Sequence, residues 1–552
     1  MRLARRATTG RVGAIAARTA AATALVLALL SGCDGFGGSP TPTGPPPPSP
    51  APPVVGEQPR PVLGVGRACA AAPARTRGLR ATVRRGQPFV VGEIPAAMWR
   101  EPPTADASGQ LAFWGFMYLP PMVVRAHRDR DRAALTTMVE QLVRFHAENP
   151  DPGRNLRGWD EGATFRRLDA LTCLYAATGD ARLRGPMYAN VRVLFSSRYY
   201  GPPYRAVHNH GVFANLAVWN AGLLLGAEEW VRRARERIAA EAPQAFTRAG
   251  MTREQSSKYQ KVNLDVWKRA ADRIAERDPH DPVVTALRAV LERGAQVLGW
   301  LVEPDGRLVQ LGNTERLAVR GAPGRGDLWR DDEAGVAVGR WSWTDPATTY
   351  YTVRYGPPTQ AHGHAEHGGV TFTAGGARVL VNPGLYTYDR ESPWHRYARS
   401  PEGANTAVPA SGAPIKGRRA QLRSLGHGQG CHRWQISGRV GPHDHTRDVT
   451  VDGHGRRMAV TDGYADPTPF TQFWHLDPDW RPAGGDTRQQ VFRHTSGRVL
   501  TVATTGVLAP PLIGAEVPPA GWHFPRQGVR RPAPEVRVAS AGGPVTTTFT
   551  VS

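Results

Sequence analysis

Three short segments of this 552-residue chain concentrate side chains that can move protons or bind anions. The densest begins at residue 361 with AHGHAEHGG and contains His362, His364 and Glu366. On a strand, a His-x-His spacing places two imidazoles on one face, where they can serve catalysis or hold a metal. A chance histidine-rich loop is the alternative interpretation. Tyr388, at the end of the same stretch, is assigned to substrate binding.

The second segment is His208-Asn209-His210-Gly211, which precedes an apolar helical stripe. We expect Asn209 and His210 to lie at a helix N-terminus, where free backbone amides and the helix dipole favour an anion. The alternative is a capping asparagine flanked by surface histidines.

The third segment reads EQSSKY from Glu254 to Tyr259, just before another helical stretch. Lys258 and Lys261 lie close in sequence and are expected to favour ionisation of the Tyr259 phenol. A tyrosine on a helix is more often a packing residue, which is the alternative. Glu254 is assigned to substrate binding.

Two kinds of element must position these side chains. Residues 76–310 show apolar residues at helical spacing, as in Leu135, Met138 and Leu142. Residues 311–552 contain short alternating runs separated by Gly, Pro and Asp, which is typical of an antiparallel sandwich. The sequence therefore predicts a multidomain α+β protein, with a helical half, a strand half and a cleft where they meet.

The N-terminus predicts export and lipidation. Five arginines precede the apolar run 20–30, and Leu30-Ser31-Gly32-Cys33 resembles a bacterial lipobox. About eleven apolar residues are too few to span a bilayer, which disfavours a membrane anchor. We expect residues 1–33 to be a lipoprotein signal peptide with Cys33 lipidated, and the proline-rich segment 34–75 to be a tether. The protein is then a cell-membrane lipoprotein on the extracytoplasmic face.

The composition limits the partners. The formal net charge is +22 and is carried almost entirely by arginine, which favours polyanions but also fits a biased genome composition. Basic runs with interleaved aromatics and DNA-binding motifs are missing from the sequence, so we expect no nucleic-acid partner. Cys69, Cys173 and Cys431 are neither a disulfide framework nor a zinc-finger pattern, and the sequence leaves any pairing open.

Taken in order, the segments resemble the heparinase II/III-like polysaccharide lyases of the alginate and heparin lyase type. The resemblance rests on NHGVFANLAVWNAGLLLG from Asn209, REQSSKYQ at 253–260, DGRLVQLGNT at 305–314, and HGHAEHGGVTFTAGGARVLVNPGLYTYD from His362. The chain has Gln260 where the family commonly has histidine, and Asn313 where it has aspartate.

The resemblance implies an N-terminal α/α toroid followed by a C-terminal antiparallel β-sandwich, with an acidic polysaccharide between them. It also implies β-elimination beside a uronate carboxylate. Asn209 and His210 would bind and polarise that carboxylate. Tyr259 would take or deliver the proton, and His362 would be the opposing base or neutraliser.

Some members of the family hold a structural zinc, and the resemblance puts His364 among its ligands. Here Asn382 and Ala404 replace the other two expected ligands. One strong ligand does not hold zinc, since closed sites have four. We therefore expect no cofactor; a site rebuilt with Glu366 or His367 is the alternative.

Two other functions remain open at this stage. A non-catalytic lipoprotein that binds acidic glycans would keep the scaffold without turnover. A glycoside hydrolase needs two carboxylates flanking the bond, for which Asp160, Glu161 and Glu254 are candidates without a clear pairing.

Overall fold

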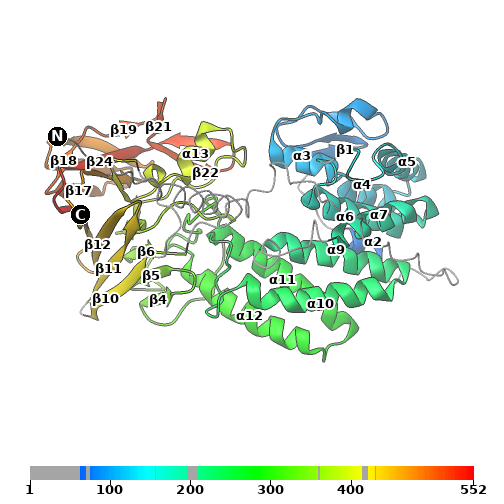
Figure 1. Ribbon diagram of the computed structural model, residues 1–552, viewed down its shortest axis with the longest axis horizontal. Helices are drawn as coiled ribbons and strands as arrows, with labels where there is room; N and C mark the ends of the chain where they lie inside the picture. Colours follow the sequence, from blue (N-terminus) through cyan, green and yellow to red (C-terminus); the bar gives the residue numbers. More distant parts are fainter. Residues whose placement is uncertain are drawn as a thin grey trace, which may run out of the picture.

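The computed structural model describes residues 63–69, 75–155, 157–196, 208–357, 361–412, 420–428 and 430–552. A helical N-terminal region and a strand-rich C-terminal region lie side by side, the helices in blue to green and the strands in green to red (Figure 1). The predicted signal peptide, with Cys33, lies outside the described residues. Among the residues that are described, no helix is long and apolar enough to cross a membrane.

The helical region is an α/α toroid built from packed neighbouring helices. Its helices are α2 Val65–Ala68, α3 Ala107–Trp114, α4 Leu119–Arg128, α5 Arg132–Glu148, α6 Glu161–Thr178, α7 Arg184–Phe195, α9 Asn209–Leu225, α10 Glu228–Ala245, α11 Ser257–Arg277 and α12 Pro282–Trp300, with short 3-10 turns η1 Ala96–Trp99 and η2 Ala181–Leu183. A small antiparallel sheet precedes them, formed by β1 Arg75–Arg77, β2 Arg80–Thr82 and β3 Phe89–Val90. This sheet lies in the part of the chain that was expected to be helical.

The helices form where apolar spacing and capping residues agree. In α5, the predicted stripe of Leu135, Met138 and Leu142 is buried. Asp131 caps its N-terminus by accepting a hydrogen bond from the Ala134 amide. Burial of this face against the other helices, rather than helix propensity, stabilises the element.

The strand-rich region is an antiparallel β-sandwich with additional sheet layers. One five-stranded sheet has the order β4-β5-β6-β7-β8, and an eight-stranded sheet has the order β10-β11-β12-β13-β25-β17-β16-β15. A further sheet has the order β18-β24-β14-β9, with β19 paired to β24, and two hairpins, β20-β21 and β22-β23, are appended. A short helix α13 Pro393–Arg399 and a turn η3 Pro401–Gly403 lie among them.

The strands of this region lie within residues 311–552, where the sequence predicts them. They are β4 Leu328–Asp331, β5 Val336–Arg340, β6 Tyr350–Arg354, β7 Val370–Ala374, β8 Ala377–Leu380, β9 Ala407–Pro409, β10 Gln421–Gly428, β11 Cys431–Val440, β12 His443–Asp452, β13 Arg457–Tyr464, β14 Phe470–His475, β15 Trp480–Gly485, β16 Gln489–His494, β17 Val499–Thr504, β18 Val507–Leu508, β19 Leu512–Ile513, β20 Ala515–Glu516, β21 Pro519–Ala520, β22 Trp522–Arg526, β23 Val529–Pro532, β24 Pro534–Ser540 and β25 Val545–Val551. One apolar core joins the three large sheets.

A separate apolar cluster connects the two regions. Trp300 and Leu301, at the end of α12, pack with Leu311 and with Val336 and Tyr350 of the first sheet. The Tyr350 hydroxyl donates to the Trp300 carbonyl at 3.0 Å. This buried contact fixes the helices relative to the strands, and so fixes any site built from both.

Cys69 and Cys173 form a disulfide, which the sequence had left unassigned. The bond ties the segment around α2 to α6 across 104 residues. Cys431 is free.

Candidate active site

The N-terminus of α9 brings the predicted residues Asn209 and His210 to the junction, together with their neighbour His208. His208, rather than an asparagine, is the N-cap: its Nδ1 accepts from the His210 amide at 3.3 Å. Asn209 is buried, and its side-chain amide donates to the Glu254 carboxylate at 2.9 and 3.1 Å. His210 keeps 22% exposure and bonds through Nδ1 to Glu161 at 2.9 Å.

Glu254 is fully buried at the junction, next to Asn209 and His362. Its Oε1 accepts from the Asn209 backbone amide and from Asn263 Nδ2, both at 2.8 Å. Its Oε2 lies 3.3 Å from His362 Nε2. Burial raises the pKa of Glu254 to about 8, although the amide hydrogen bonds pull it down. Glu254 was assigned to substrate binding; in this structure it contacts protein side chains.

Tyr259 stacks face to face on His362, with ring centroids 3.5 Å apart and planes 9° apart. Its hydroxyl is 3.0 Å from the Tyr388 hydroxyl, which brings another predicted residue into the site. The expected effect of the two lysines is wrong: burial raises the pKa of Tyr259 well above its ordinary value. Lys258 pairs with Glu315, and Lys261 pairs with Asp265 on the exposed helix face.

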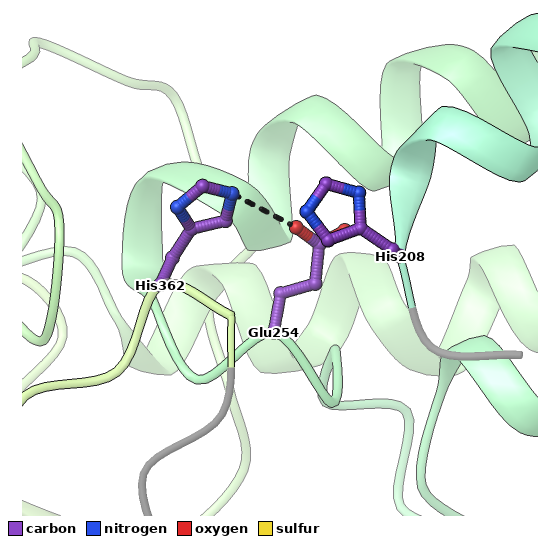
Figure 2. A group of neighbouring side chains, drawn as sticks. All are labelled: His208, Glu254 and His362. Atoms are coloured by element: carbon purple, nitrogen blue, oxygen red, sulfur yellow. Dashed lines mark ion pairs between the residues drawn. The ribbon is translucent and has the colours of Figure 1, made fainter. Parts of the chain in front are cut away.

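His362 comes from the strand-rich region and reaches the helices. Its backbone amide donates to the Glu254 carbonyl at 3.2 Å, and its carbonyl accepts from the Asn313 amide at 2.8 Å. Burial, followed by the charge of Arg399, lowers the pKa of His362 well below its ordinary value, so the ring is neutral. Figure 2 shows the Glu254 carboxylate lying between the His362 and His208 imidazoles.

Residues 361–368 form a loop, so the predicted pair of histidines on one face of a strand is wrong. A hairpin follows it, formed by β7 and β8 around Gly375 and Gly376, which take positive φ. In the loop, Ala361 has φ 40°, and on the facing segment Gln255 has φ 57°. Non-glycine residues in this conformation store strain, which gathers at functional sites.

His364 is buried, with its Nε2 2.7 Å from Asn313 Oδ1. Asn382, at the position expected for a second zinc ligand, donates to the buried Glu366. The Gly312 amide donates to the other oxygen of Glu366 at 3.1 Å. Ala404 offers no ligand atom. His364 and Asn382 bond to other protein groups, and the three positions do not fit the zinc site that the resemblance implied.

A different group has metal-ligand atoms close together: one from each of His208, Glu254 and His362 lie within 4.8 Å of one another (Figure 2). Two observations set it apart from a preformed site. The His208 and His362 Nδ1 atoms each accept an N–H, which places the ring proton on Nε2. Glu254 accepts several amide hydrogen bonds. The donor set is arranged for hydrogen bonding rather than for coordination.

Gln260, which stands where histidine is common in the resembling family, has a structural role here. It is fully buried. Its Oε1 accepts from the Thr252 amide at 2.6 Å, and its Nε2 donates to the carbonyls of Gly250 and Gly294. Gln260 therefore braces the loop that leads into Glu254.

Sequence reasoning missed three contacts of the site. Asn263 lies one helical turn after Tyr259 and donates to Glu254, a spacing that could have been noticed. Glu161 was considered only as a hydrolase carboxylate, and its contact with His210 was not anticipated. Asn313 contacts both His362 and His364, and no local pattern predicts that.

A cavity of about 260 Å³ also lies at the junction, lined by Thr252, Arg253, Gln255, Glu333, Arg354 and neighbouring residues.

Comparison with known proteins supports the architecture. Residues 329–550 match the family model "Heparinase II/III-like, C-terminal". No curated protein matches the chain by sequence. A heparan sulfate lyase from Pedobacter heparinus, in mutant form, superposes with a TM-score of 0.63 at 14% identity, over 86% of this chain and 81% of that one.

Two further solved structures are similar. Heparinase III gives a TM-score of 0.66 at 14% identity, over 84% of this chain and 79% of that one. A chondroitin AC lyase mutant from Streptomyces coelicolor A3 gives 0.50 at 14%, over 80% and 74%. At such identities the likeness shows a shared fold. Residues 329–550 therefore match the heparinase II/III-like C-terminal domain, and the toroid and β-sandwich share the fold of these polysaccharide lyases.

Proposed function

We propose that the protein is a lyase that cleaves a uronate-containing acidic polysaccharide by β-elimination. The observation that carries the proposal is the assembly of Tyr259, His362 and His210 at one junction, from α11, from the 361–368 loop and from α9. Residues that were predicted from separate segments meet only because the two regions pack together.

The electrostatics suit an acidic substrate. Besides His210, the cations acting on His362 are Arg399 and Lys258, and Arg166 acts on Tyr259. A uronate carboxylate would bind against the N-terminus of α9, with the free backbone amides and His210 as hydrogen-bond donors. These donors stabilise the charge that develops when the neighbouring C5 proton leaves.

Tyr259 has the properties needed for the proton transfers. Its raised pKa keeps the phenol protonated, which is the form that delivers a proton to the leaving glycosidic oxygen. The same high pKa makes the resulting phenolate a strong base for the C5 proton. The C5–H and C4–O bonds break, the C4=C5 double bond forms, and Tyr259 ends protonated as it began. In this assignment His362 is a neutral ring that stacks on Tyr259, and Glu254, itself bonded by Asn209, holds His362 in place.

The test is to incubate the protein with alginate, hyaluronan, chondroitin and heparan-type chains and to follow the ultraviolet absorbance of unsaturated uronate. Absorbance that rises with new chain ends supports the lyase. New reducing ends without that absorbance would indicate hydrolysis instead. Retention on a polysaccharide column without any cleavage would indicate a glycan-binding protein.

Tyr259→Phe is the matching variant. It should lose turnover by about 10²- to 10⁴-fold while still binding polysaccharide, because it removes the proton and keeps the ring. Tyr175→Phe, in α6, is the control and should retain activity. Undiminished turnover in Tyr259→Phe would remove this residue from the mechanism.

We also propose that Cys33 anchors the protein to the extracytoplasmic face of the cell membrane. The Cys69–Cys173 disulfide supports an oxidising compartment. Cys33→Ala should move the protein from the membrane fraction to the soluble fraction. Equal membrane retention of the variant would contradict lipidation at this residue.

A further inference from the structure

Asn313 is bound from four sides at the centre of the junction. Its backbone amide donates to the His362 carbonyl at 2.8 Å, and its carbonyl accepts from Ser256 Oγ at 3.2 Å. Its side chain contacts His362 Nδ1 at 3.2 Å through Nδ2, and His364 Nε2 at 2.7 Å through Oδ1. Asn313 is 2% exposed, so water does not substitute for these partners.

The neighbouring turn is shaped to bring Asn313 this close. Gly312 has φ 58°, and a Cβ there would lie 2.4 Å from the His362 carbonyl oxygen and 2.5 Å from that of Gln255. Thr314 Oγ1 is 2.9 Å from Ser256 Oγ and accepts from the Lys258 amide at 3.1 Å. The 312–314 turn therefore locks the start of α11 and the His362 loop to each other.

The two side-chain contacts of Asn313 define the protons on both rings. A short contact of 2.7 Å fits an N–H donating to oxygen, so His364 Nε2 carries a proton and Asn313 Oδ1 accepts it. The amide nitrogen then faces His362 and can only donate, so His362 Nδ1 is the acceptor. A neutral imidazole with an accepting Nδ1 carries its proton on Nε2.

That Nε2 lies 3.3 Å from Glu254 Oε2, an oxygen that already accepts from Asn209 Nδ2 at 2.9 Å. The other Glu254 oxygen accepts from Asn209 and Asn263. The groups around Glu254 are donors, and a His362 with its proton on Nε2 completes the set. The opposite tautomer would point two N–H groups at each other between Asn313 and His362.

We infer that Asn313 is a positioning residue that holds His362 in the tautomer with the proton on Nε2, where it donates to Glu254, so that His362 does not act as a base. This inference rests on the proposed lyase function for its consequence, but not for the tautomer itself. Aspartate at this position, as in the pattern that the chain resembles, would accept from Nδ1 and favour the opposite arrangement.

The first experiment is ¹⁵N NMR of the full protein labelled at histidine, without substrate, with His362→Gln to assign the ring signals. We expect His362 to show a protonated Nε2 and an unprotonated Nδ1. A protonated Nδ1 would overturn the inference. This spectrum tests the tautomer of His362 even if Asn313→Asp, the variant of the second experiment, fails to fold. It also stands if the protein proves not to be a lyase.

The second experiment uses Asn313→Asp, which keeps the shape and removes the donor. His362 should change to a protonated Nδ1, and kcat/KM should fall about 10- to 100-fold, mainly through kcat. Asn382→Asp is the matched control: it makes the same change at a buried asparagine that contacts Glu366, and His362 should keep its tautomer. An unchanged tautomer or an unchanged kcat/KM in Asn313→Asp would overturn the role assigned to Asn313.

Discussion

Two fully buried carboxylates, one in each region of the molecule, have opposite surroundings. In the sandwich, Asp462 is bonded by Arg447 through two nitrogens at 2.7 and 2.8 Å, and this partner holds the pKa of Asp462 well below its ordinary value despite burial. At the junction, Glu254 is bonded by amides and lies beside a neutral imidazole, and burial raises its pKa to about 8. A carboxylate that only supports the fold is matched by charge. A carboxylate held close to its titration point is suited to a site.

The largest expected effect separates the two carboxylates by function. Glu254→Gln should lower lyase activity by about a hundredfold or more, because it removes the acceptor for His362 Nε2–H. Its free energy of unfolding should change far less than that of the Asp462 variant below. The measurement is turnover together with urea unfolding. Full activity in Glu254→Gln would contradict the assignment of Glu254 as the functional carboxylate of the two.

The converse change is Asp462→Asn. Removing one partner of a buried ion pair costs about 3–5 kcal/mol, because Arg447 is left unmatched. We expect that loss in the free energy of unfolding by denaturant titration, while the folded fraction keeps its kcat. A loss below about 1 kcal/mol would show that the pair is not a structural support.

The helical region depends on a covalent link that the sandwich lacks among its described residues. Cys69→Ser removes the bond to Cys173, which closes a span of 104 residues. The free energy of unfolding should fall by about 2–4 kcal/mol. Cys431→Ser, at the free cysteine, is the control and should leave unfolding nearly unchanged. Equal effects of the two variants would contradict a stabilising link.

The pH dependence tests the raised pKa of Glu254. The carboxyl group loses its proton as pH rises through about 8, so the ionised form that accepts from His362 increases with pH. We expect kcat/KM to rise about tenfold per pH unit below that point and then to level off. Glu254→Gln should lack this limb. A rate that falls as pH rises toward 8 would mean that the neutral acid is the active form.

The smallest expected effect is that of chelation. Prolonged dialysis against EDTA should leave activity and melting temperature unchanged, because His364 and Asn382 at the predicted zinc positions bond to other protein side chains and the group around Glu254 is arranged for hydrogen bonding. Loss of activity that zinc restores would show that His208, Glu254 and His362 coordinate a metal.

The sequence by itself predicted the elements and most of the site residues. Helix and strand periods depend on local spacing, so the α5 stripe and the strand-rich character of residues 311–552 could be predicted. Asn209, His210, Tyr259 and His362 were found through motif residues. Lipidation at Cys33 stays a prediction, because this residue lies outside the described residues.

Only the tertiary structure decided how these residues act. Whether Tyr259 gains or loses basicity depends on burial and on charges from other segments, and its neighbouring lysines proved to be paired elsewhere. The contact of Asn313 with His362 joins residues 49 apart in the chain, and the Cys69–Cys173 pairing joins residues 104 apart. Such contacts follow from the packing of whole regions, so no local pattern encodes them.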